Sequence, residues 1–234
     1  MSPDFPPAHT TQELLERYAA LAYDKQNDLY EVIGDNAWNA DLNVGTISFG
    51  PELDFPIQIL GTFSHSSETW LWAWANAQSD LPAGLLSQAE QLRAYGEQHG
   101  IELFTASEFD ATDRDLHTIG IIAAGMFGAS AYYLANYGQG TMVVTLKSAR
   151  LDQMPRNDFA RIPSAFPQVI SAFELHHRPA FIHYLTQKGY SVTETADTVS
   201  ATVDFGTLTA TFDHLGRLAN LKGQSGNQSE PAAS

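Results

Sequence analysis

Cysteine is absent from this chain of 234 residues. Its absence excludes disulfide bonds, thiolate catalysis, and zinc or iron–sulfur sites ligated by cysteine. Basic residues are scarce too, with 12 lysines and arginines against 27 aspartates and glutamates, and the formal net charge is -15. Because a surface this negative repels phosphate groups, we expect neither nucleic acid nor a membrane as a partner and favour a basic protein instead.

Targeting segments and long hydrophobic runs are also missing. The first 18 residues have neither a basic start nor an apolar core, so they do not resemble a signal peptide. The longest stretch without charged residues runs from Leu116 to Leu146, and its apolar centre covers only 17 residues rich in glycine and alanine. A membrane span needs about 20 apolar residues. We therefore expect a buried helix here and a cytoplasmic protein.

The sequence does contain enough apolar material for a folded core. Hydrophobic residues make up 44% of the chain and aromatic residues 11%, which excludes global disorder. The charge is distributed unevenly. Residues 1–150 hold 19 acidic and 6 basic residues, whereas residues 151–234 hold 8 and 6. Any acidic surface therefore belongs mainly to the first part of the chain.

The spacing of apolar residues predicts an α+β fold with antiparallel sheets and packed helices. Helical periodicity and a capping box at Thr10–Glu13 predict a first helix that ends at Gly34, and further helices are expected over 82–99 and 112–136. Alternation predicts strands over 40–49, 53–63 and 70–75, which form an antiparallel meander, and shorter strands over 101–105 and 141–147.

Composition further predicts two units, each a helix followed by antiparallel strands. The main domain is expected at 10–147 and a smaller unit at 166–223, joined by a proline-containing linker at 148–165. In the smaller unit we expect Pro179 to interrupt the helix, because proline cannot donate the interior hydrogen bond. Residues 1–9 are predicted to be loose and residues 224–234 to form a disordered tail.

Motifs for catalysis, metals or cofactors are not found. His176 and His183 are seven residues apart, whereas zinc-binding helices place histidines at i and i+4. Neither glycine-rich phosphate-binding motif occurs, so we expect no cofactor and no metal. His65 stands among serines and next to Glu68 in a predicted hairpin loop, but no nucleophile elbow accompanies it.

Tryptophan forms the most unusual local pattern. Trp70, Trp72 and Trp74 share one face of a predicted strand. Large rings at alternate positions are typical of a core, and tryptophan is also enriched in binding sites. Both interpretations stay open. In the second, a cleft near these rings would also contain His65 and His117.

Several segments resemble a bacterial family known as domain of unknown function 6882. The resemblance covers about residues 10–147 and is carried by four stretches: Gly61–His65 with Glu68–Asn76, Ala89–Gly96 with His99–Ile101, Leu116–Thr118, and Tyr132-Tyr133. It implies a bacterial origin and no particular activity. It draws attention to the tryptophan run, to the helical segment Arg93–Gly96 and to the turn Leu116–Thr118. The candidate binding residues are His65, Glu68, Trp70, Trp72, Trp74, His117, Tyr132 and Tyr133.

Two functions from different classes follow from these observations. The first is non-catalytic binding of a basic protein, for example the masking of a toxic effector by an immunity-like protein. In that case the acids Glu13, Glu16, Asp24, Asp28 and Glu31 of the first helix should form one exposed face. The alternative is a small-molecule binder, or an enzyme of unfamiliar type, that uses a cleft lined by tryptophan.

Overall fold

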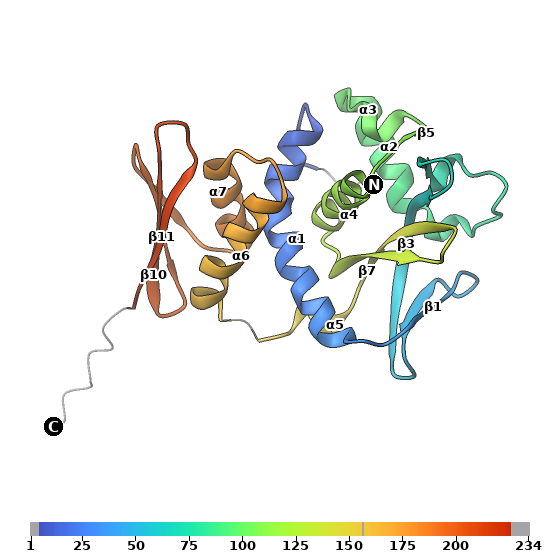
Figure 1. Cartoon of the computed structure of the whole chain (residues 1–234), viewed down its shortest axis with the longest axis horizontal. Helices are drawn as coiled ribbons and strands as arrows, with labels where there is room; N and C mark the ends of the chain where they lie inside the picture. Colours follow the sequence, from blue (N-terminus) through green and yellow to red (C-terminus); the bar gives the residue numbers. More distant parts are fainter. Residues whose placement is uncertain (1–4, 156, 226–234) are drawn as a thin grey trace. The chain divides into compact units, whose positions relative to one another are not determined.

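The computed structural model describes residues 5–155 and 157–225, and it divides the chain into two compact units (Figure 1). The first unit comprises residues 1–154 and the second residues 155–234. The boundary falls inside the predicted linker at 148–165. However, most of that segment is helical, since it contains α5 (Ala149–Asp152) and the start of α6 (Asp158–Ala172). The linker prediction is therefore wrong in its extent.

Helix α1 (Thr11–Ile33) begins at the predicted N-terminal cap. The hydroxyl of Thr10 accepts a hydrogen bond from the backbone N–H of Glu13 at 3.1 Å, and the Glu13 carboxylate accepts one from the N–H of His9 at 2.8 Å. The helix packs on α4 (Asp113–Met126). There the ring of Tyr18 lies so close to Gly125 that a side chain on this glycine would collide with it.

The sheet of the first unit is antiparallel throughout. The strands β1 (Trp38–Asp41), β2 (Thr46–Phe49), β3 (Leu53–Ser64), β4 (Thr69–Trp72) and β5 (Glu108–Asp110) pair in that order, and β7 (Gly140–Leu146) pairs with both β3 and β6 (Ala131–Asn136). The predicted meander is thus present. The single strand predicted over 40–49 is instead a hairpin, because Gly45 turns the chain with a φ of +79°.

Two further predictions for the first unit are wrong. The helix predicted over 112–136 ends at Met126, Gly128 has a φ of +56°, and the following residues form β6. The strand predicted over 101–105 is the short helix α3 (Glu102–Thr105), which follows η2 (Ala83–Leu85) and α2 (Ser87–His99). A run of alanine and apolar residues suits a helix and a buried strand alike, and only pairing with a distant strand decides between them.

The N-terminal segment is held in place from Phe5 onward. The Phe5 ring contacts the edges of Tyr95 and Phe127, and Arg17 donates hydrogen bonds to the carbonyl oxygens of Pro6 and Pro7 at 3.0 Å each. The prediction of a loose start at 1–9 is therefore wrong for residues 5–9. Residues 1–4 lie outside the described part of the chain.

The second unit packs two helices on a four-stranded antiparallel sheet. Helix α6 is followed by α7 (His177–Gln187), and the strands run β11-β10-β9-β8 across the sheet. Their bounds are Val192–Glu194 for β8, Thr198–Val203 for β9, Gly206–Phe212 for β10 and Leu218–Ser225 for β11. Pro179 lies in the first turn of α7, where no interior hydrogen bond is lost. The break between the helices precedes it.

Residues 224 and 225 of the predicted tail belong to β11, and residues 226–234 lie outside the described part. The α+β class predicted from the sequence is confirmed, with antiparallel sheets and packed helices in both units. Within the described ranges, every helix is too short or too polar to traverse a lipid bilayer.

Candidate functional site

The tryptophan stripe is part of the core of the first unit. Trp70 and Trp72 project from one face of β4, both are 0% exposed, and their rings meet edge to face at 5.4 Å. The Trp70 ring covers Gly61 of β3, where a side chain would collide with it, and the indole N–H of Trp72 donates to the carbonyl oxygen of Leu103 at 3.0 Å. Rings with no exposed surface cannot line a cleft.

Trp74 departs from the predicted stripe as well. It lies in the short 3-10 helix η1 (Ala73–Ala75) rather than in a strand, and it is half-buried. The guanidinium of Arg93, on α2, lies 4.5 Å from the centre of its ring, a distance typical of a cation–π contact. The cleft lined by tryptophan that the sequence suggested is therefore not formed.

His117 and Tyr132 form a pair between α4 and β6. The Nδ1 atom of His117 lies 2.8 Å from the phenol oxygen of Tyr132. Burial lowers the pKa of His117, against the opposing charge of Asp113, and burial raises the pKa of Tyr132. Both groups are therefore neutral near pH 7, and one of them donates a single hydrogen bond to the other, which suits a packed pair in the interior.

The remaining candidate residues lie elsewhere. Tyr133 is on the other face of β6, where its ring contacts the edge of Phe49 at 4.9 Å and burial raises the pKa of its phenol. Glu68 is exposed in the β3–β4 turn with a φ of +54°, and its carbonyl oxygen accepts a hydrogen bond from Ala111. The structure does not bring the eight candidate residues into one site.

His65 fastens two hairpin turns together. Its Nδ1–H donates to the carbonyl oxygen of Gly138 at 3.0 Å, its Nε2 lies 3.0 Å from the hydroxyl of Thr141, and its backbone N–H donates to the carbonyl oxygen of Gln139 at 3.1 Å. Both ring nitrogens of His65 are therefore engaged in hydrogen bonds within the fold. It joins the β3–β4 turn to the β6–β7 turn.

Beside His65 lies a hollow of about 720 Å³ on the outer face of the sheet, which we name the hairpin groove. Its floor is formed by outward-facing residues of β3 and β4, on the face opposite Trp70 and Trp72. The lining residues are Thr62, Ser64, His65, Ser66, Thr69, Leu71, Glu108, Tyr137, Gly138 and Gln139. Of these lining residues, only His65 was among the binding residues predicted from the sequence. An aromatic residue in the turn Tyr137–Gly140 was the available signal for the rest.

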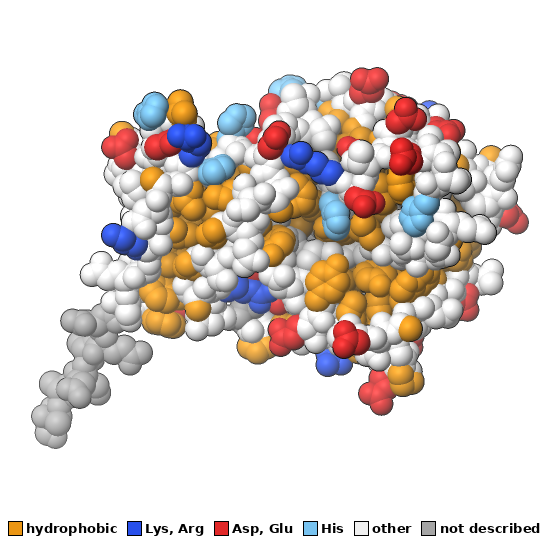
Figure 2. Space-filling view, in the orientation of Figure 1, with side chains coloured by type: hydrophobic (Ala, Val, Ile, Leu, Met, Phe, Trp, Pro, Cys, Tyr) orange, Lys and Arg blue, Asp and Glu red, His pale blue; other side chains and the backbone are white. Residues whose placement is uncertain are grey.

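Carboxylates gather at the edge of the sheet next to this groove, and all of them except the half-buried Asp115 are exposed. We give the name acidic patch to Glu102, Glu108, Asp110, Asp113 and Asp115. The stretch 101–115, which contains all five acids, has a single basic residue, Arg114. Three of the five acids, Glu102, Asp110 and Asp115, line one hollow of about 480 Å³. Figure 2 shows acidic side chains gathered over the part of the first unit that carries α3 and β5.

The acids of α1 do not form the exposed face that was expected. Asp24 and Asp28 are 1% exposed and Glu16 is 7% exposed, whereas Glu13 and Glu31 reach solvent. That prediction is wrong, because the apolar face of α1 and three of its acids are buried together.

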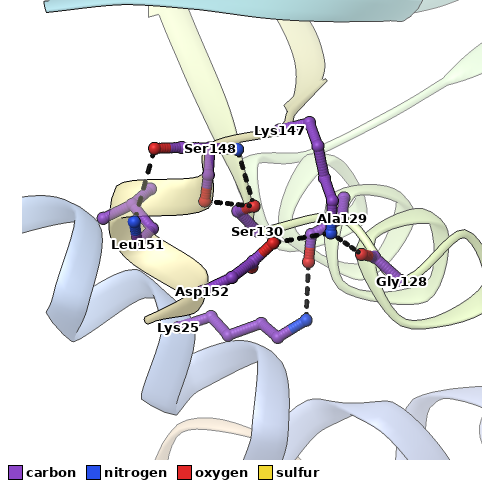
Figure 3. Close-up of polar contacts among 8 residues, drawn as sticks. All are labelled: Lys25, Gly128, Ala129, Ser130, Lys147, Ser148, Leu151 and Asp152. Carbon is purple, nitrogen blue, oxygen red and sulfur yellow. Dashed lines mark hydrogen bonds and ion pairs between the residues drawn. The ribbon is translucent and has the colours of Figure 1, made fainter. Parts of the chain in front are cut away.

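A cluster of lysines at the end of α4 is structural (Figure 3). Lys25 donates to the carbonyl oxygen of Ala129 at 2.6 Å, and Lys147 donates to that of Gly128 at 2.9 Å and pairs with Asp152 at 2.8 Å. Burial raises the pKa of Asp152, but hydrogen bonds from Lys147 and Ser130 and the nearby positive charges outweigh it, so the pKa is lowered. The cations satisfy carbonyl groups just beyond a helix end.

The histidines of the second unit do not gather either. The Nδ1 of His177 accepts a hydrogen bond from the backbone N–H of Leu218 at 3.0 Å, and burial, followed by the charge of Arg217, lowers its pKa. Within residues 5–155 and 157–225, no three histidine or carboxylate side chains are close enough together to hold a metal ion.

Comparison with known proteins identifies the family of the first unit. A family model described as a family of unknown function (DUF6882) matches residues 12–149, so the chain belongs to this family. The match covers the first unit almost completely and ends before the second. No curated protein and no solved structure matches the chain.

Proposed function

We propose that this protein binds a basic partner protein through the acidic patch, without chemistry of its own. The observation that supports this best is the position of β5. This strand pairs with β4 on one side and with no other described strand, and its residues Glu108 and Asp110 are exposed. A free strand edge offers unpaired backbone groups to an incoming segment.

The pairing of β5 with β4 determines which backbone N–H and carbonyl groups of β5 are available to a partner. The N–H of Ala111 donates to the carbonyl oxygen of Glu68, just before β4, and the carbonyl oxygen of Ser107 accepts from the N–H of Trp72 on β4. Phe109 lies opposite Trp70. In an antiparallel pair the hydrogen-bonding direction alternates, so the backbone groups of Glu108 and Asp110 point away from β4. The partner is thus an extended segment with lysine or arginine at alternate positions, where its side chains meet these carboxylates.

Charge favours this partner over an acidic or neutral one. The first unit carries 20 acidic and 6 basic residues, whereas the second carries 7 and 6. Complementary charge accelerates association and suppresses wrong partners. One form of the proposal is the immunity-like masking of a basic effector.

The experiment compares two double charge reversals of equal size. A seven-residue peptide that alternates lysine with threonine is titrated into the full chain by fluorescence anisotropy. Glu102→Lys/Asp110→Lys should weaken binding at least 10-fold, while Glu31→Lys/Glu52→Lys, which reverses exposed acids outside the patch, should weaken it less than 3-fold. Binding should also decrease with added salt, because screening shortens to about 8 Å at physiological ionic strength.

A capture from native cells at low salt then identifies the partner. Wild-type protein and the Glu31→Lys/Glu52→Lys variant should retain the same basic protein, and the patch variant should lose it with an unchanged melting temperature. Equal loss in both variants would show that only net charge matters, and the proposal would be wrong.

A further inference from the structure

The hairpin groove has the size of a ligand site and an unusual lining. Its volume of about 720 Å³ lies within the range of roughly 300–1,000 Å³ that is typical of small-molecule pockets. Most such pockets are mainly apolar, whereas Leu71 is the one large aliphatic side chain among the lining residues of this groove. A partner protein that inserts an apolar anchor would find little to bury it against.

Hydroxyl groups are the most numerous polar groups of the lining. Four serine and threonine hydroxyls are joined by the phenol of Tyr137, the amide of Gln139 and the carboxylate of Glu108. A hydroxyl both donates and accepts hydrogen bonds, and a carboxylate and an amide add strong acceptors. The lining residues include no lysine or arginine, so an anionic ligand would have no cation to neutralise it. This chemistry suits a neutral ligand that carries many hydroxyl groups.

Tyr137 adds an aromatic surface at the edge of the groove. Its side chain is 50% exposed, although large rings are usually buried. The phenol lies over Gly140, whose missing side chain leaves the space that the ring occupies. The turn is further fixed by hydrogen bonds from the N–H of Tyr137 to the carbonyl of Gly140 at 3.0 Å and from the N–H of Gly138 to the side chain of Asn136 at 2.8 Å.

The two walls of the groove are held at a fixed separation. His65 bonds from the β3–β4 turn to Gly138, Gln139 and Thr141 on the other hairpin. Ser64 and Ser66 on the first wall lie within 3.2 Å of each other, oxygen to oxygen. A site that is already ordered loses little conformational entropy when a ligand binds.

We propose that the hairpin groove binds a carbohydrate. The apolar C–H face of a sugar ring packs on Tyr137, and the sugar hydroxyls bond to Glu108, Gln139 and the serine and threonine hydroxyls. The groove shares Glu108 with the acidic patch, whereas Tyr137 and Gln139 lie outside the patch, so the two proposals can be tested separately.

The test titrates a panel of neutral trisaccharides, namely maltotriose, cellotriose, xylotriose and N-acetylated chitotriose, into the isotope-labelled full chain and follows amide NMR shifts. At least one sugar should bind with a Kd below about 1 mM, a modest affinity for a small polar ligand, and should shift resonances of the two hairpin turns. Tyr137→Ala should weaken binding at least 10-fold, and Tyr137→Phe should stay within 3-fold of the wild type because it keeps the ring.

Tyr30→Ala is the matched control, because Tyr30 is 55% exposed and does not line the groove. It should bind the sugar as the wild type does. The Glu102→Lys/Asp110→Lys variant should do so too, and this result would show that sugar binding is independent of the proposed binding of a partner protein. Absence of binding by all four sugars would overturn the proposal. So would shifts confined to residues outside the hairpin turns, or equal losses in Tyr137→Ala and Tyr30→Ala.

Discussion

Lys147 and Asp152 in the first unit, and Lys188 and Asp158 in the second, form ion pairs of nearly equal length in different surroundings. The distances are 2.8 and 2.7 Å. The side chains of the first pair are 59% and 35% exposed, and those of the second are 3% and 13% exposed. Water screens the first pair, so distance alone says little about the contribution of either to stability.

The buried pair also belongs to a larger network. The single hydrogen of the Tyr190 hydroxyl is shared between carboxylate oxygens of Asp158 at 3.0 Å and Asp204 at 3.2 Å, and Asp204 also accepts from the backbone N–H of Phe159 at 3.0 Å. Burial, and then the hydrogen bond and charge of Asp158, raise the pKa of Tyr190. This network fixes the start of α6 against the end of α7 and the β9–β10 turn.

Removing one lysine from each pair should produce the largest contrast. Lys188→Met leaves the Asp158 carboxylate buried without its cation and should lower the free energy of unfolding by about 3 kcal/mol. Lys147→Met should lower it by less than about 1 kcal/mol. Both are measured by urea denaturation followed by far-UV circular dichroism.

Tryptophan fluorescence reports the unfolding of the first unit alone, because all four tryptophans lie there. It therefore shows which unit has lost stability. For Lys188→Met, the urea midpoint measured by circular dichroism should decrease more than the urea midpoint measured by fluorescence. Equal losses of unfolding free energy in Lys188→Met and Lys147→Met would contradict the expectation that the buried pair contributes more to stability.

A methyl group on Gly125 should cause the next largest effect. Alanine is usually preferred over glycine inside a helix by about 1 kcal/mol. Here the Tyr18 ring occupies the position of the added carbon, so Gly125→Ala should destabilise the first unit by about 2 kcal/mol. Gly84→Ala is the control, since no atom lies within 4 Å of its added carbon, and it should change stability by less than about 0.5 kcal/mol. The readout is the urea midpoint of tryptophan fluorescence.

A smaller effect is expected from pH. His117 in the first unit and His177 in the second both have pKa values lowered by burial. A histidine whose pKa is lower in the folded state stabilises the protein above its unfolded pKa of about 6.5, and that contribution is lost as pH decreases through the folded pKa. Stability should therefore decrease from pH 7.5 to pH 5.

Two glutamine variants assign this pH dependence to the units. His117→Gln should reduce the slope of the fluorescence midpoint against pH, and His177→Gln should reduce that of the circular dichroism midpoint. Slopes that match the wild type in both variants would show that other groups are responsible.

Local patterns predicted the elements whose signals lie within a few residues. The cap at Thr10, the helix end at Gly34 and the long alternation of β3 were all recognisable, because capping and alternation depend on neighbouring residues. The family membership of the first unit also followed from segments such as Glu68–Asn76. The candidate site was predicted poorly. One interpretation of the sequence expected a cleft that contained Trp70, Trp72, Trp74, His65 and His117, whereas the structure buries Trp70 and Trp72 together in the core and does not form that cleft.

The sequence by itself determined the α+β class, the excess of acid in the first unit, and the absence of any thiol chemistry. Only the tertiary structure decided that Tyr132 lies in a strand, that Asp24 and Asp28 are buried, and that Tyr137 faces a hollow lined by hydroxyl groups. Composition and local periodicity are properties of short stretches of chain. Burial and the formation of a groove depend instead on which distant segments pair, as β3 does with β7, and a single sequence does not contain that pairing in any local pattern.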